Sequence, residues 1–150
     1  MLYTYRMQKQ NKAATPKVYV KRFNVWTKLK RKVHNYDGPT AHCKPRDVFW
    51  VSVGHNVGFE VDGKNDNFER PVLVLRVFST NLFLGVPLTS QVHDGDYFFS
   101  LEYGGIPSVA ILSQVRAYSQ KRLLNKMGVV PIDMFKSLKR KYVEKVLQME

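Results

Sequence analysis

Two segments of the chain, one toward each end, space their apolar residues as an amphipathic helix does. In residues 18–36 the apolar positions recur every few residues, from Phe23 through Trp26 to Val33. The opposite face carries three basic side chains: Lys28, Arg31 and Lys32. Asp37-Gly38-Pro39 ends the pattern, because glycine and proline cannot continue a helix. The spacing predicts a helix that packs its apolar face on the protein and leaves its basic face as a candidate electrostatic footprint.

The second helical pattern follows Pro131, a residue that the first turn of a helix accepts. Ile132, Phe135, Leu138 and Tyr142 recur at spacings of three and four, with lysines and an arginine between them. The sequence therefore predicts an amphipathic helix near the C-terminus.

Short apolar runs separated by small and polar turn residues fill the middle of the chain. Five of these runs are expected to be strands, at residues 48–53, 71–78, 81–88, 97–101 and 108–118. Many short strands joined by such turns are typical of a compact antiparallel barrel or sandwich. The expected fold is therefore mainly β, with a basic helix before the barrel and an amphipathic helix after it.

Charge is spread unevenly along the chain. Lys and Arg number 24 against 12 Asp and Glu, a net charge of +12. Residues 1–46 hold 12 of the basic residues and a single acidic one, Asp37, so the rest of the chain is nearly neutral. Such asymmetry favours a polyanionic partner. We therefore divide the chain into a flexible basic lead (1–16), a basic helical extension (17–43) and a barrel domain (44–150).

Several classes of protein are not expected. No apolar run reaches the roughly 18 residues of a membrane span, and the first residues lack the apolar centre of a secretory signal. The single cysteine, Cys43, cannot form an intramolecular disulfide and suits a reducing compartment. His34, His42 and Cys43 lack the paired spacing of zinc ligands. We expect a cytoplasmic protein that needs no metal or other cofactor and does not enter a membrane.

The connection between the first two predicted strands is longer than most connections in compact domains, and such loops often carry function. It contains several side chains suited to binding or catalysis: His55, Asn56, Phe59, Glu60, Asp62, Lys64 and Glu69. Its end is rigid, because Pro71 fixes its own φ and restricts Arg70 toward extended backbone. A guanidinium held in this way can donate two parallel hydrogen bonds to a phosphate. An arginine at a strand end also commonly pairs with an acidic side chain, and residue type alone does not decide between the two roles.

The third predicted strand leads into Thr89-Ser90-Gln91. Two hydroxyls and an amide at one strand end can donate hydrogen bonds to phosphate oxygens. A strand cap followed by a turn explains the same triplet.

Five pieces of the chain, in this order, resemble the MazF/PemK ribonuclease toxins of bacterial toxin–antitoxin pairs. They are Lys44-Pro45-Arg46-Asp47 with the strand after it, Gly58-Phe59-Glu60, Arg70-Pro71 with its strand, Pro87-Leu88-Thr89-Ser90-Gln91, and Ser113-Gln114-Val115-Arg116 through Lys121-Arg122-Leu123. The resemblance covers roughly residues 44–147. It departs at Arg46, where the family has glycine, and at Ile111 and Ser113, where some members carry an Arg and an Asp as chemical groups.

The resemblance implies an SH3-like antiparallel barrel with a C-terminal helix, assembled as a homodimer. It implies metal-independent cleavage of single-stranded RNA that leaves a 2′,3′-cyclic phosphate, with Arg70, Thr89 and Glu60 as the catalytic residues. It also implies a cognate antitoxin, usually with an acidic and partly disordered tail. Related gyrase-poisoning toxins share the barrel and act by binding alone, so a non-catalytic toxin or an RNA-binding module is the alternative.

Physical chemistry assigns roles within that reaction. Arg70 suits a fixed positive charge beside the phosphorane, and Thr89 suits a neutral hydrogen bond to it. The base is open between Glu60, which the resemblance favours, and His55, a residue type suited to proton transfer near neutral pH. Phe59 either stacks on a base of the RNA or anchors the loop in the core. The residues expected to contact RNA are His55, Asn56, Phe59, Lys64, Gln91, Lys28, Arg31 and Lys32.

Overall fold

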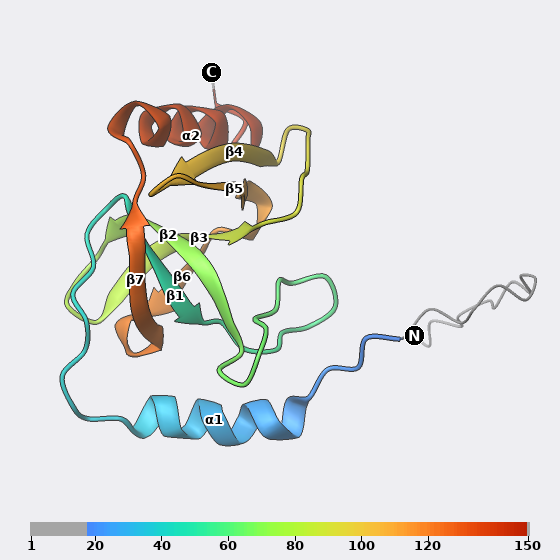
Figure 1. Cartoon of the computed structure of the whole chain (residues 1–150), viewed down its shortest axis with the longest axis vertical. Coiled ribbons are helices and arrows are strands. Elements are labelled where there is room, and N and C mark those ends of the chain that lie inside the picture. The colour runs from blue at the N-terminus through green and yellow to red at the C-terminus, as the bar shows by residue number, and fades with distance from the viewer. Residues whose placement is uncertain (1–17, 150) are drawn as a thin grey trace, which may run out of the picture.

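The computed structural model describes residues 18–149, in which a 7-stranded antiparallel sheet has one helix at each end (Figure 1). The strands are β1 (Asp47–Ser52), β2 (Glu69–Val77), β3 (Leu82–Thr89), β4 (Phe98–Tyr103), β5 (Ile106–Ile111), β6 (Arg116–Ser119) and β7 (Leu123–Val129). The helices are α1 (Phe23–Asn35) and α2 (Ile132–Lys145), and two 3-10 turns, η1 (Leu112–Gln114) and η2 (Gln120–Arg122), flank β6. The predicted basic lead lies outside the described residues.

Strand β3 pairs with three other strands of the sheet, β2, β5 and β6. The strands follow the order β4-β5-β3-β2-β1-β7, and β6 pairs with β3 as well. The start of β3 pairs with β6, whereas Leu88 and Thr89 at its end pair with β5. Strand β2 runs along the other side of β3, in a register that places Val72 opposite Pro87. The end of β3 and the start of β2 therefore meet at the same edge of the barrel.

The strand predicted at 108–118 is wrong in detail, because the chain bends at η1 and forms β5 and β6 in its place. Leu112 is buried at this bend, and the two strands pair with different parts of β3. Strand β7 was not predicted at all. Its Asn125, Lys126 and Gly128 are poor strand formers. Pairing with β1, interrupted by register shifts, makes this segment a strand.

Helix α1 begins at Phe23, the first residue of the apolar spacing, and not at residue 18, where the predicted helical segment begins. Of the predicted apolar face, Trp26 is buried and Phe23 stays about half exposed. The indole of Trp26 fits because residue 54 is glycine: its φ of +89° suits glycine, and a Cβ there would overlap the ring. Among residues 18–149 no helix combines the length and apolar character needed to cross a membrane.

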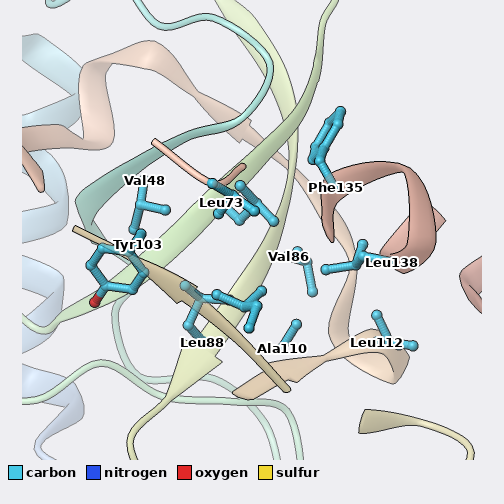
Figure 2. Close-up of a cluster of buried hydrophobic side chains, with 11 residues drawn as sticks. Val48, Leu73, Val86, Leu88, Tyr103, Ala110, Leu112, Phe135 and Leu138 are labelled. Carbon is cyan, nitrogen blue, oxygen red and sulfur yellow. The ribbon is translucent and has the colours of Figure 1, made fainter. Parts of the chain in front are cut away.

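Two clusters of buried side chains form the core. The first lies between the sheet and α2, where Phe135 and Leu138 join strand residues such as Leu73, Leu88 and Tyr103 (Figure 2). The second lies on the side of the barrel that holds β6, and its members include Phe49, Phe83, Tyr118 and the free thiol of Cys43. The predicted C-terminal helix is thus confirmed, together with its buried apolar face.

Arg46 occupies the position where the resembling family has glycine, and its φ is +79°. A non-glycine residue in this region of backbone conformation is strained. Three hydrogen bonds hold it: its N–H donates to the carbonyl of Val74 (2.9 Å), its carbonyl accepts from the N–H of Val130 (2.9 Å), and its Nε donates to the carbonyl of Val130 (2.9 Å). The departure from glycine is therefore compensated locally, just before β1.

Candidate active site

A cleft of about 280 Å³ opens where the loop between β1 and β2 meets the ends of β2 and β3. Arg70, near the start of β2, and Thr89, the last residue of β3, both line it. The other charged and polar residues of its wall include Lys64, Glu69, Ser90 and Ser108. Its apolar residues are Trp50, Pro71, Leu88, Tyr103, Ile106, Pro107 and Met127. The cleft therefore presents a fixed cation and hydroxyl groups beside a wall that carries aromatic rings.

Arg70 is held by two backbone carbonyls. Its Nε donates to the carbonyl of Asp62 (2.8 Å), and its NH1 donates to the carbonyl of Leu88 (3.1 Å). A guanidinium has five N–H donors, so these two bonds leave three of them unused. Burial in the wall lowers the pKa of Arg70, but a guanidinium remains charged at neutral pH. Among the described residues no carboxylate forms an ion pair with Arg70, so the strand-end ion pair considered from the sequence is not found.

Thr89 both caps its strand and lines the cleft. Its Oγ1 accepts a hydrogen bond from the N–H of Gln91 (3.2 Å), and its carbonyl accepts one from the Ser108 hydroxyl (3.2 Å). The hydroxyl hydrogen of Thr89 remains free to donate, because Oγ1 acts only as an acceptor in the first bond. The two interpretations of the Thr89-Ser90-Gln91 triplet are thus compatible with each other.

Glu60 lies elsewhere. Its side chain is exposed and lines a second hollow of about 360 Å³, together with Asn56, Ser113, Gln114 and Arg116. Neither Arg70 nor Thr89 contributes to that hollow. The structure therefore brings Arg70 and Thr89 together and leaves the predicted catalytic carboxylate outside their cleft.

The predicted RNA-contacting residues of the loop are also divided. Lys64 lines the cleft with Arg70. Phe59 is fully exposed, so the interpretation of this ring as an anchor in the core is wrong. Asn56 lines the second hollow while its amide donates to the carbonyl of Val61 (2.8 Å). Gln91 is exposed and lines neither hollow.

His55 is buried, with 6% of its surface exposed. Its ring packs edge-on against Phe68 at 4.7 Å between centroids, and its Nδ1 lies 3.2 Å from the Tyr19 hydroxyl and 3.3 Å from an Asp62 carboxylate oxygen. Contact with RNA through this ring would require the loop to open. His55 is therefore excluded from the proposed RNA interface and from the candidate bases.

The basic face of α1 is exposed, with Lys28, Arg31 and Lys32 directed away from the buried Trp26. Helix α1 lies at the end of the barrel opposite α2 (Figure 1). None of these three side chains lines the cleft of Arg70 or the hollow of Glu60. Any RNA contact they make would extend a bound strand beyond the cleft.

Asp62 is the polar centre of the β1–β2 loop, a role that the sequence did not indicate. Its carboxylate accepts from the backbone N–H of Asn56 (2.6 Å) and from Lys21 (3.2 Å), besides the contact to His55. Partial burial alone would raise the pKa of Asp62. The hydrogen bonds from Asn56, His55 and Lys21, with the charge of Lys21, outweigh burial and hold that pKa below its ordinary value of 3.8. Asp62 therefore stays ionised and orders the loop.

Glu69 belongs to the loop set marked in the sequence, but sequence reasoning assigned it no role. It stands next to Arg70 in the chain and lines the same cleft as Thr89. Its backbone pairs with that of Lys64, in a narrow turn at the end of the loop. This pairing begins β2 before the proline at which the apolar pattern starts, so the pattern alone gave no sign of it.

Comparisons with known proteins agree with this fold. A family model described as "PemK-like, MazF-like toxin of type II toxin-antitoxin system" matches residues 44–145. The chain is similar to a crystal structure of MazF from Deinococcus radiodurans, with a TM-score of 0.60 and 19% identity over 75% of this chain and 100% of that chain. No curated protein matches the sequence.

Two mycobacterial structures are similar as well. An endoribonuclease in complex with its cognate antitoxin, from a mycobacterial species, has a TM-score of 0.55 and 9% identity over 73% of this chain and 99% of that chain. The Mycobacterium tuberculosis toxin MazF-mt6 has a TM-score of 0.52 and 15% identity over 70% and 99%. At these identities, similarity to solved structures supports the fold alone. Membership of a protein family is shown by the match to the family model.

Proposed function

The chain belongs to the PemK-like, MazF-like toxin family of type II toxin–antitoxin systems, and from this premise we propose that it is a metal-independent endoribonuclease of single-stranded RNA. The observation that carries the proposal is that Arg70 and Thr89 line one cleft at the end of β3. Similar folds include proteins described as endoribonucleases. The cleft is of a size and chemistry suited to a phosphodiester with a flanking base.

The proposed reaction uses the RNA's own nucleophile. The 2′-hydroxyl loses its proton and its oxygen bonds to phosphorus, while the bond from phosphorus to the 5′-oxygen breaks and that oxygen gains a proton. The products are a 2′,3′-cyclic phosphate and a 5′-hydroxyl. Arg70 holds the developing negative charge with the donors that its carbonyl partners leave free, and Thr89 adds a neutral hydrogen bond. The apolar wall beside them, with Trp50 and Tyr103, gives a base a surface on which to stack.

We further propose the division of labour along the chain. The barrel at 44–150 carries the reaction, and the extension at 17–43 supports it. The functional unit is a homodimer. The inhibiting partner is a cognate antitoxin with an acidic segment, which a chain of net charge +12 would attract. Similar solved structures include a MazE–MazF complex from Deinococcus radiodurans and a mycobacterial endoribonuclease in complex with its cognate antitoxin.

The test is to incubate the purified protein with single-stranded RNA in excess EDTA and to sequence the ends. We expect cleavage that yields 5′-hydroxyl ends and cyclic phosphates. Thr89→Ala should cleave more slowly, and Thr89→Ser should restore most of the rate by restoring the hydroxyl. Absence of cleavage by the wild type, or 3′-hydroxyl ends, would rule out this mechanism. Toxicity that persists without cleavage and depends on residues 142–147 would favour the non-catalytic alternative.

The identity of the base is a separate prediction. Geometry comes before acidity in choosing a base, and Glu69 shares the cleft with Arg70 whereas Glu60 does not. We therefore expect Glu69→Gln to lower kcat by about 10²–10⁴-fold and to flatten the acidic limb of the pH–rate profile. Glu60→Gln, which makes the same change outside the cleft, is the matched control and should keep that limb. The reverse result would return the role to Glu60, as the family resemblance suggests.

A further inference from the structure

The segment before α1 contacts the β1–β2 loop at its polar centre. Lys21 lies there with its ammonium group 3.2 Å from the Asp62 carboxylate, and its side chain is largely buried. The same ammonium donates to the backbone carbonyls of Asn56 and Gly58. One cation thus neutralises the loop's buried carboxylate and satisfies two of its carbonyl groups.

The loop residue that Lys21 binds also positions the proposed catalytic cation. The carbonyl of Asp62 accepts the hydrogen bond from Arg70 Nε (2.8 Å). Lys21 binds Asp62 at its carboxylate and binds the backbone of the same loop at Asn56 and Gly58, so its contacts restrain the backbone that carries the Asp62 carbonyl. A continuous path of contacts therefore runs from Lys21 through Asp62 to Arg70.

The same segment before α1 has two more side-chain contacts with the loop: the Tyr19 hydroxyl lies 3.2 Å from His55 Nδ1 and donates to Asp62 (3.4 Å), and Arg22 donates to the carbonyl of Asn65 (3.2 Å). Val57 and Phe59 at its tip are exposed. On its far side, Gln114 accepts from the N–H of Val61 (3.1 Å) and donates to the carbonyl of Phe59 (3.2 Å). Phe68 is buried at the end of the loop, but the tip has little apolar burial and depends on polar contacts for its conformation. Such segments open at low free-energy cost.

We propose that Lys21 is a positioning residue for the cleft: it holds the β1–β2 loop in the conformation that places Arg70. This inference rests on the proposed function, because it assigns Lys21 to that same site. It also gives the N-terminal extension a task distinct from RNA binding. The matched family model begins only at residue 44, so the extension is an addition to the part of the chain that the model covers.

The test compares three variants. Lys21→Ala removes the contacts, Lys21→Arg restores a cation, and Lys136→Ala makes the same charge change at an exposed position on α2, at the other end of the barrel. Two quantities are measured for each: amide hydrogen exchange of residues 56–62 without RNA, and kcat and KM for RNA cleavage.

We expect faster exchange of the loop in Lys21→Ala and a kcat lower by about tenfold or more, because small misplacements of catalytic groups cost up to about 10²-fold. KM should change no more than in Lys136→Ala, and Lys21→Arg should recover both readouts. Unchanged loop exchange, or faster exchange with wild-type kcat, would overturn the proposal. If wild-type protein does not cleave RNA, the proposed function fails, and the exchange data still decide whether Lys21 holds the loop.

Discussion

Replacing Arg70 with alanine is expected to lower kcat for RNA cleavage by about 10²–10³-fold or more, the usual loss when one preorganised donor to a developing oxyanion is removed. The guanidinium lies in the cleft wall, where burial lowers its pKa and strengthens its field on a bound phosphate. Two carbonyls fix its orientation, so its remaining donors are set before substrate arrives. Single-turnover cleavage of a defined RNA oligonucleotide measures the effect.

Three controls make this result specific. Arg70→Lys keeps the positive charge but loses the planar guanidinium that donates two parallel hydrogen bonds. Its cleavage rate should therefore lie between the rates of the wild type and of Arg70→Ala. Arg76→Ala removes an exposed arginine from the same strand and should cleave at the wild-type rate. Circular dichroism and thermal unfolding should show that Arg70→Ala remains folded. A folded Arg70→Ala variant with undiminished cleavage would remove Arg70 from the mechanism.

The pairing of Arg70 with Thr89 could be predicted from the sequence because it follows from strand order. The register sets Val72 opposite Pro87 in neighbouring antiparallel strands. Arg70 and Thr89 lie two residues beyond this pair, toward the same edge of the barrel, so both reach one cleft. Apolar runs that predict β2 and β3 as consecutive strands are therefore enough to bring these two motifs together.

The parts that could not be predicted depend on contacts between distant segments. Strand β7 is a strand because it pairs with β1, and its own residues favour that conformation weakly. Asp62 in the loop reads as one acidic residue among several, and only its partners Lys21 and Asn56 make it a structural centre. No pattern in the sequence predicts which distant side chains the residues of a long loop contact.

Glu60 and His55 show the same limit at the site itself. Both residue types suit proton transfer, and both belong to a loop that sequence reasoning correctly marked as unusual. The structure assigns one to an exposed hollow beside Arg116 and the other to a buried position against Phe68. Residue type predicted the chemistry available in the loop, but the path of the loop keeps Glu60 out of the cleft and burial keeps His55 out of it.

Phe68→Ala is the substitution for which we expect the largest loss of stability, about 3–5 kcal/mol as for other buried phenylalanines cut to alanine. The side chain is fully buried, and its ring lies 5.5 Å from that of Trp26 and 4.7 Å from that of His55. Its carbonyl accepts from the N–H groups of Val53 (2.8 Å) and Gly54 (2.9 Å). Phe68 thus joins α1, the loop and the end of β1. Urea unfolding followed by tryptophan fluorescence measures the change.

Phe59→Ala is the matched control, because it removes the same ring from the same loop at a fully exposed position. Its free energy of unfolding should stay within about 0.5 kcal/mol of wild type. If Phe59 stacks on a base, KM for RNA should rise in this variant while stability does not change. Equal losses of stability in the two variants would contradict the assignment of Phe68 as the anchor of the loop. A selective loss in Phe68→Ala, accompanied by faster amide exchange in α1, would show that the extension and the cleft are held together through this ring.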